Sequence, residues 1–137
     1  MAMVIDVSAV MPWCFEDEAT PDSHACWLRA TGEPVVVPAL WSVEVLNVLL
    51  VAERRGRLLP NETDLFLSVL QRLRVEVDAT AYEDQWSAAL PVARTSDLSA
   101  YDACYLELAL RRRLPLATRD RKLVAAAAST GVEVIPA

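Results

Sequence analysis

Four acidic residues, far apart in the sequence, lie where a predicted strand ends or a predicted helix begins. They are Asp6, Glu44, Asp102 and Asp120. Carboxylates that crowd together repel one another unless a proton or a cation lies between them. An all-oxygen set of this kind suits Mg²⁺, or Mn²⁺ in its place, rather than zinc. If the fold brings the four side chains together, they predict hydrolytic chemistry that depends on carboxylates and a metal ion.

Asp102 is an acid on the apolar side of a predicted helix, within the segment LSAYDACYLEL at residues 98–108. Leu106 and Ala109, one and two helical turns further on, share its face. A charge on such a face is costly unless it is paired or bound to a metal. The position therefore favours a role for Asp102 in a cluster of acids.

Each acid also has an ordinary structural interpretation. Asp6 and Asp120 could be N-caps of the helices that follow them. Asp102 lies three residues after Ser99 and could belong to a capping box. Glu44 could be an ordinary residue on a helix surface. These interpretations remain open for each acid taken alone. They do not explain why all four acids would lie at the same edge of the fold, which would then be a coincidence.

Other catalytic chemistries have little support in the sequence. The only histidine, His24, has no G-x-S-x-G motif beside it, so neither a Ser-His-Asp nor a Cys-His site is expected. The cysteines Cys14, Cys26 and Cys104 are odd in number and lack C-x-x-C spacing. A disulfide framework or a zinc site is therefore not expected, and a reducing cytoplasm is the simpler interpretation.

Basic residues are concentrated in one window of a chain whose net charge is −6. The net charge argues against general affinity for nucleic acid. The window 111–122 nevertheless holds six of the 13 Lys and Arg residues, namely Arg111, Arg112, Arg113, Arg119, Arg121 and Lys122. A solvated helix end with a favourable dipole interaction is the alternative explanation.

Strands and helices alternate along the predicted chain. Strands are predicted at residues 4–5, 35–37, 75–77, 115–118 and 132–135. Helices are predicted at 7–15 (with Ser8 as a possible cap), 21–31, 39–55, 61–73, 81–94, 99–113 and 119–129. Short apolar strands that alternate with helices indicate an α/β fold with a parallel sheet covered on both faces. Ligands of such sheets bind beyond the carboxyl ends of the strands.

This topology places the four acids at one edge. Asp6 ends the first strand, and Asp120 follows the fourth strand two residues after Thr118. Glu44 lies near the start of the helix that follows the second strand. Asp102 lies in the first turn of the helix that leads into the fourth strand, and this helix must begin near the same edge. Asn47, three residues after Glu44, could orient its carboxylate or a bound water, or could be an ordinary surface residue.

The chain of 137 residues, of which 54% are hydrophobic, is expected to form one domain over 1–137. We expect such an apolar chain to hide surface in an oligomer. No apolar run approaches the length of a membrane span, and the N-terminal segment does not have the pattern of a signal peptide.

Four segments together resemble the PIN-domain family, and among its members the VapC-type toxins of bacterial toxin–antitoxin pairs. They are VIDVSA at 4–9, LWSVEVLNVL at 40–49, LSAYDACYLELA at 98–109 and LATRDRKLVAAA at 116–127. The resemblance implies a three-layer α/β/α fold with a five-stranded parallel sheet in the order 3-2-1-4-5. It carries the family's acidic quartet onto Asp6, Glu44, Asp102 and Asp120, with Thr118 and Ser8 as supporting residues. Lys122 stands where some relatives have a further acid, so the chain departs from a fully occupied second metal site.

The resemblance further implies an Mg²⁺-dependent endoribonuclease toxin, with Mn²⁺ as an alternative metal, that leaves a 5′-phosphate and a 3′-hydroxyl. The basic residues of 111–122 would then hold RNA phosphates. A homodimer and a small VapB-type antitoxin, which often offers a basic residue to the acidic pocket, are the implied partners.

Two rival interpretations are open. A non-catalytic module with this fold could bind RNA or its partner, although binding alone does not require four crowded acids. A phosphatase of the haloacid-dehalogenase or receiver type also has an acid after its first strand. The former needs a second Asp at the position of Ser8, and the latter needs an acidic pair that is missing here.

Overall fold

Five parallel strands form the centre of the structure, in the order β3-β2-β1-β4-β5. The computed structural model describes all 137 residues. The strands are β1 (Met3–Ile5), β2 (Val35–Pro38), β3 (Val75–Asp78), β4 (Leu116–Ala117) and β5 (Val134–Ile135). The predicted α/β class and the predicted strand order are therefore confirmed.

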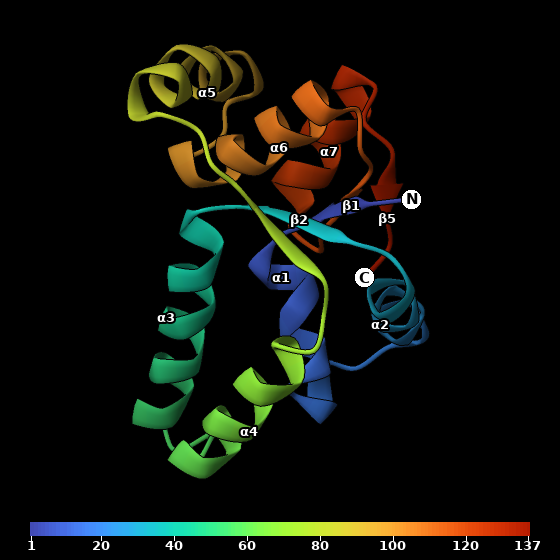
Figure 1. The fold of residues 1–137 in the computed structure, drawn as a ribbon, viewed down its shortest axis with the longest axis vertical. Helices are drawn as coiled ribbons and strands as arrows, with labels where there is room; N and C mark the ends of the chain where they lie inside the picture. Colours follow the sequence, from blue (N-terminus) through green and yellow to red (C-terminus); the bar gives the residue numbers. More distant parts are fainter.

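Helices cover both faces of this sheet (Figure 1). On one side lie α1 (Val7–Val10), α2 (Pro21–Gly32), α3 (Leu40–Arg54) and α4 (Pro60–Leu70). On the other side lie α5 (Tyr82–Ser96), α6 (Ala100–Arg112) and α7 (Arg121–Thr130). Two short 3₁₀ helices, η1 (Met11–Trp13) and η2 (Glu16–Glu18), follow α1. No helix combines the length and the apolar character needed to cross a membrane.

The first helical segment differs from the prediction of one helix over 7–15. The α-helix ends at Val10 and continues as the 3₁₀ helix η1. Pro12 has no N–H group to donate to the carbonyl of Ser8, so an α-helix cannot continue through it. Ser8 is not the cap of this helix, because Asp6 occupies the N-cap position and accepts the N–H of Ala9.

The strands β1, β2 and β4 are apolar because helices cover both faces of the sheet around them. The edge strand β3 is more exposed and carries Glu76 and Asp78. Val35, Val36 and Val37 are β-branched residues between two prolines, and all three are buried. The β1 residues are equally buried. They belong to one cluster of 32 buried hydrophobic residues.

The order in which strands are added to the sheet changes direction between β1 and β4: β2 and β3 lie on one side of β1, whereas β4 and β5 lie on the other. These two strands are neighbours, with Val4 paired to Leu116 and Ile5 to Ala117. The connections through α1 to α4 run on one face, and those through α5 to α7 run on the other. Such a switch point opens a crevice beyond the carboxyl ends of the two strands. In Figure 1, α3 and α6 both begin at this edge.

Candidate active site at the carboxyl edge of the sheet

Asp6 lies directly after β1, with only 4% of its surface exposed. Both of its carboxylate oxygens accept hydrogen bonds. Ser8 Oγ donates to Oδ1 at 2.7 Å and the Ala9 N–H donates to the same oxygen at 3.1 Å. Thr118 Oγ1 donates to Oδ2 at 2.6 Å. Burial raises the pKa of Asp6 from 3.8 to about 6, even though these hydrogen bonds lower it.

The end of β4 is joined to the end of β1 through Thr118. While Thr118 donates to Asp6, its own hydroxyl oxygen accepts the N–H of Asp120 at 3.1 Å. The N–H of Arg119 donates to Ser8 Oγ at 2.8 Å. Asp120 is the N-cap of α7 and accepts the N–H of Leu123 at 3.0 Å. This network holds Asp6 and Asp120 at the switch point.

Glu44 reaches the same edge from α3, where it contacts α6. Tyr105 Oη donates a hydrogen bond to Glu44 Oε1. Burial raises the pKa of Glu44, the bond from Tyr105 lowers it, and the charge of Asp102 raises it again. Burial and the neighbouring acids keep the pKa of Tyr105 above its ordinary value, so its hydroxyl remains a donor.

Asp102 is the electrostatic centre of this group. Burial raises the pKa of Asp102, the charge of Asp120 raises it further, and Lys122 lowers it. The charge of Asp102 in turn raises the pKa values of Asp6 and Glu44. The structure thus places the four predicted acids at one edge of the sheet, with Asp102 close enough to interact electrostatically with each of the other three.

The ordinary structural interpretation is confirmed for two of the acids. Asp6 and Asp120 are the N-caps of α1 and α7. Ser99 is the N-cap of α6, and its hydroxyl accepts the N–H of Asp102 at 3.1 Å. The two interpretations are therefore compatible, because the helices that these residues cap begin at the edge where the acids gather.

The donor set matches a hard divalent cation, since it consists of carboxylate oxygens that repel one another. No three acidic, histidine or cysteine side chains are arranged closely enough to form a complete metal site as they lie. The fit therefore rests on the type and charge of the donors, with Asp6, Glu44, Asp102 and Asp120 as the residues that could hold the ion. Burial is the main cause of the raised pKa values of Asp6, Glu44 and Asp102, and a cation would relieve the repulsion that adds to it.

The family model described as "PIN domain" matches residues 3–129 of this sequence. The chain belongs to the PIN domain family. No curated protein sequence matches it.

Solved structures of similar fold include three with broad coverage. PAE2754 from Pyrobaculum aerophilum is 24% identical, with a TM-score of 0.71 over 98% of this chain and 84% of that chain. VapBC2 from Rickettsia felis, bound to a promoter DNA fragment, is 10% identical, with a TM-score of 0.67 and coverages of 99% and 98%. FitAcB from Neisseria gonorrhoeae is 20% identical, with a TM-score of 0.65 and coverages of 98% and 96%. Because these sequence identities are low, the similarities establish only that this chain shares the fold of these proteins.

In this PIN domain the polar partner of Glu44 differs from the expected one. The side chain of Asn47 is exposed and makes no hydrogen bond within the protein, so its supporting role stays a prediction. Tyr105 contacts Glu44 instead, and sequence reasoning missed it. The available signal was its position three residues after Asp102, on the same side of the helix.

The three arginines at the end of α6 do not join the acids. Arg111 Nη2 lies 2.7 Å from Asp78 Oδ2, and Arg112 Nη1 lies 3.0 Å from Glu76 Oε1. These pairs join α6 to β3, at a point about 15 Å along the helix axis from Asp102. Arg113 follows the last residue of α6 and makes no ion pair. The expectation that this triplet binds RNA stays a prediction, and two of its members, Arg111 and Arg112, form ion pairs within the protein.

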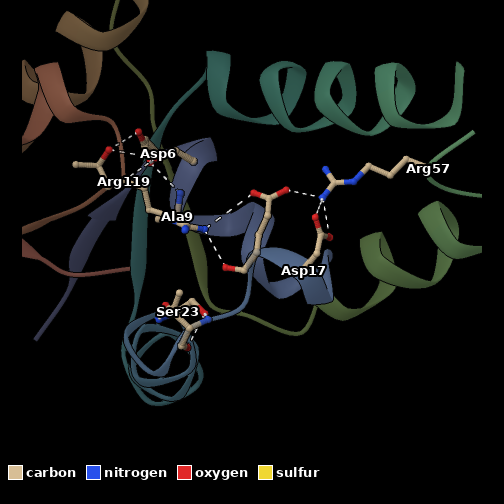
Figure 2. A network of polar contacts seen from close by, with 10 residues as sticks. Asp6, Ala9, Asp17, Ser23, Arg57 and Arg119 are labelled. Carbon is tan, nitrogen blue, oxygen red and sulfur yellow. Dashed lines mark hydrogen bonds and ion pairs between the residues drawn. The ribbon is translucent and has the colours of Figure 1, made fainter. Parts of the chain in front are cut away.

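Arg121 and Lys122 lie in the first turn of α7, beside the acids, and make no ion pair within the protein. Arg119 has partners of its own, because its Nη1 donates to the carbonyl oxygen of Glu18 at 3.1 Å and lies 4.0 Å from the Glu18 carboxylate. Figure 2 shows the polar network that runs from Asp6 past Arg119 to Arg57. The basic window thus divides into two groups, and Arg121 with Lys122 are its unpaired side chains near the site.

Proposed function

We propose that this PIN domain is a metal-dependent endoribonuclease and the toxin of a VapB–VapC-type pair. The observation that carries the proposal is the position of Asp102, whose charge acts on Asp6 and Glu44 and is itself affected by Asp120. Membership of the PIN family supports a nuclease role. Four acids in mutual repulsion have no evident use in a protein that only binds RNA.

The proposed metal is Mg²⁺, with Mn²⁺ as the alternative, held by Asp6, Glu44, Asp102 and Asp120 directly or through water. When bound, such an ion supplies a Lewis acid for the scissile phosphate and lowers the pKa of its water toward neutrality. The acids retain their orientation through the chain's own bonds, since the hydroxyls of Ser8 and Thr118 both donate to Asp6. No histidine is needed as the base. The expected products carry a 5′-phosphate and a 3′-hydroxyl.

Arg121 and Lys122 are the proposed RNA contacts. Both lie beside the acids without an ion pair, and the charge of Lys122 already acts on Asp102. Positive side chains at an acidic edge offset its repulsion of phosphates. Arg119 is a further candidate, because the release of Glu18 would free its guanidinium group.

The proposed partner is a VapB-type antitoxin. The solved structures of similar fold include proteins described as a toxin–antitoxin complex from Klebsiella pneumoniae and as VapBC2. A basic side chain of such a partner would be attracted to the acidic edge of this chain and would compete there with metal and substrate.

A homodimer is proposed on the basis of exposed apolar side chains. They lie on α3 and α5 and include Val43, Leu46, Leu50, Tyr82, Trp86 and Leu90. We name these six residues the α3–α5 surface. An open apolar pocket of about 350 Å³ lies between α5, α6 and the start of α3, next to this surface. Homodimer interfaces are more apolar than the rest of a protein surface.

The proposal is tested by RNA cleavage with the purified protein in Mg²⁺ and in EDTA. Asp6→Asn should keep the fold, because Asn is also a good N-cap, and should lose metal-dependent cleavage by several orders of magnitude. Asp64→Asn is the matched control, since Asp64 is an exposed acid on α4 whose side chain makes no ion pair.

Two results would contradict the proposal. Cleavage by Asp6→Asn at the wild-type rate would leave Asp6 only as a helix cap. A wild-type protein that binds RNA in Mg²⁺ without cleaving it would favour the alternative, a non-catalytic PIN-fold module.

A further inference from the structure

Tyr105 is a buried tyrosine whose hydroxyl reaches into the acidic site. Only 1% of its surface is exposed, and it is among the largest fully buried side chains of the core. The only hydrogen bond of its side chain is the one that Oη donates to Glu44 Oε1. The two residues are 61 positions apart, on α3 and α6, so this bond joins the two helical layers at the carboxyl edge.

Because of this contact, the two carboxylate oxygens of Glu44 differ in their hydrogen bonding. Oε1 accepts the Tyr105 hydroxyl, whereas Oε2 has no hydrogen-bond or ion-pair partner in the protein. Glutamate has three rotatable side-chain bonds, and an unheld carboxylate at the edge of a site would sample several orientations. The bond from a rigid, buried ring removes most of that freedom.

The surroundings of the hydroxyl argue against a purely packing role. A phenylalanine would fill the same space without bringing a polar group into the core, where it needs a partner. A neutral backbone carbonyl would be a sufficient partner for a tyrosine hydroxyl in a purely packing role. Instead, the partner is one of four mutually repelling acids, and three of these acids, Glu44, Asp6 and Asp102, act on Tyr105 itself.

We propose that Tyr105 is a positioning residue that holds Glu44 by Oε1 and leaves Oε2 alone to face the cation site. This inference rests on the proposed metal-dependent function. Glu44 would then bind the ion, or one of its waters, through Oε2 alone. Groups that orient a metal ligand in this way commonly contribute tenfold to a hundredfold to metal affinity or activity.

The test measures Mn²⁺ binding by calorimetry and by the electron paramagnetic resonance spectrum of the bound ion. Tyr105→Phe should bind Mn²⁺ roughly tenfold to a hundredfold more weakly than wild type. Its kcat for RNA should fall while its KM stays close to the wild-type value, because no RNA contact is removed. Tyr101→Phe is the matched control, since the Tyr101 side chain is exposed and its hydroxyl makes no hydrogen bond within the protein.

A double-variant comparison separates positioning from packing. If Tyr105 acts through Glu44, then Tyr105→Phe should change Mn²⁺ affinity in the wild-type background and hardly change it in a Glu44→Gln background. Thermal melts in EDTA check that each variant is folded, and the Phe ring retains the volume of the Tyr ring.

The outcomes distinguish the inference from the proposed function. Wild-type Mn²⁺ affinity in Tyr105→Phe, together with weakened binding in Asp102→Asn, would overturn the positioning role and leave the metal site intact. An equal loss of affinity on Tyr105→Phe in both backgrounds would also overturn it, because the effect would not pass through Glu44. A wild-type protein that neither binds Mn²⁺ nor cleaves RNA would overturn both.

Discussion

Asp6 has two roles: one favours its ionised form and the other favours its protonated form. As the N-cap of α1 it accepts backbone and hydroxyl donors, which favour the ionised form. As a buried acid near Asp102 it is pushed toward the protonated form. Burial is the larger effect, and the pKa of Asp6 is raised to about 6. The ionised acid is therefore a source of instability that a bound cation can relieve.

This conflict predicts how stability depends on pH in the absence of metal. The folded pKa of Asp6 is about 6 and the ordinary value is 3.8, so the folded state binds more protons between these values. The free energy of unfolding should then fall as pH rises from about 4 to about 6, by about 3 kcal/mol. Urea unfolding in EDTA at several pH values measures this slope.

Asp6→Asn is the variant that isolates the effect, because it removes the titrating group and keeps the cap. Its unfolding free energy should vary less with pH than that of wild type across the same window. Asp78, whose pKa is lowered by the hydrogen bond from Arg111, acts in the opposite direction and only below about pH 4. Identical slopes in wild type and Asp6→Asn would contradict the raised pKa.

Asp102→Asn distinguishes the acid cluster from a simple helix-end role by the sign of its effect. If the charge of Asp102 repels the other acids, the Asn variant should be more stable than wild type in EDTA at pH 7. It should also gain less stability from added Mg²⁺. If Asp102 only favours the N-terminus of α6, the Asn variant should lose about 0.3–1 kcal/mol with or without metal. Paired thermal melts in EDTA and in Mg²⁺ decide between the two.

At the scale of elements, α6 links the site to the far edge of the sheet. Its first turn carries Asp102, and its last turn carries Arg111 and Arg112. These two arginines contact Asp78 and Glu76 of β3, which is an edge strand of the sheet. Such partly exposed pairs contribute at most about 1 kcal/mol each. Their role in this structure is to hold β3 against α6.

The two basic groups should therefore behave differently toward RNA. Replacing Arg121 and Lys122 with Gln should weaken RNA binding and reduce the slope of log K against log salt by about 1.4, because each single-strand phosphate contact contributes about 0.7. Replacing Arg111 and Arg112 with Gln should leave that slope unchanged and lower the melting temperature slightly. Binding titrations at several salt concentrations, in a cleavage-deficient Asp6→Asn background, measure both. If the salt dependence changed only in the variant of Arg111 and Arg112, the RNA contacts would belong to those two residues instead.

Much of the element order was predictable, because buried parallel strands are short apolar runs. The strand at 35–37 is recognisable from three valines between prolines, and the acids at strand ends follow from the parallel topology. What could not be predicted depends on distant partners. Arg111 finds Asp78 across 33 positions, and Tyr105 finds Glu44 across 61. No local pattern in the sequence specifies such pairs.

Local geometry explains the remaining differences. The predicted cap Ser8 lies inside α1, because Asp6 already accepts the N–H group at that helix start. The fourth and fifth strands contain only two residues each, fewer than predicted. Gly131 ends α7 with a φ of 82°, a conformation that favours glycine, and β5 begins only after the turn that follows.

At the scale of the whole molecule, the surface carries two features that bear on function. The acids gather at the carboxyl edge, whereas the α3–α5 surface presents apolar side chains to solvent. Tyr82 and Trp86 pack edge to face there, with ring centroids 5.0 Å apart. Exposed apolar side chains such as these support the proposed homodimer interface.

Trp86 is the residue that best tests the proposed homodimer, because 68% of its surface is exposed in the single chain. Trp86→Arg should convert a dimer of wild-type chains into a monomer, since a charge in an apolar interface loses its hydration without gaining a partner. Leu28→Arg is the control, because Leu28 lies on α2, outside the α3–α5 surface, and is 57% exposed. Sedimentation velocity gives the molecular mass of each. A wild-type monomer would contradict self-association, and a Trp86→Arg dimer would place the interface on another surface.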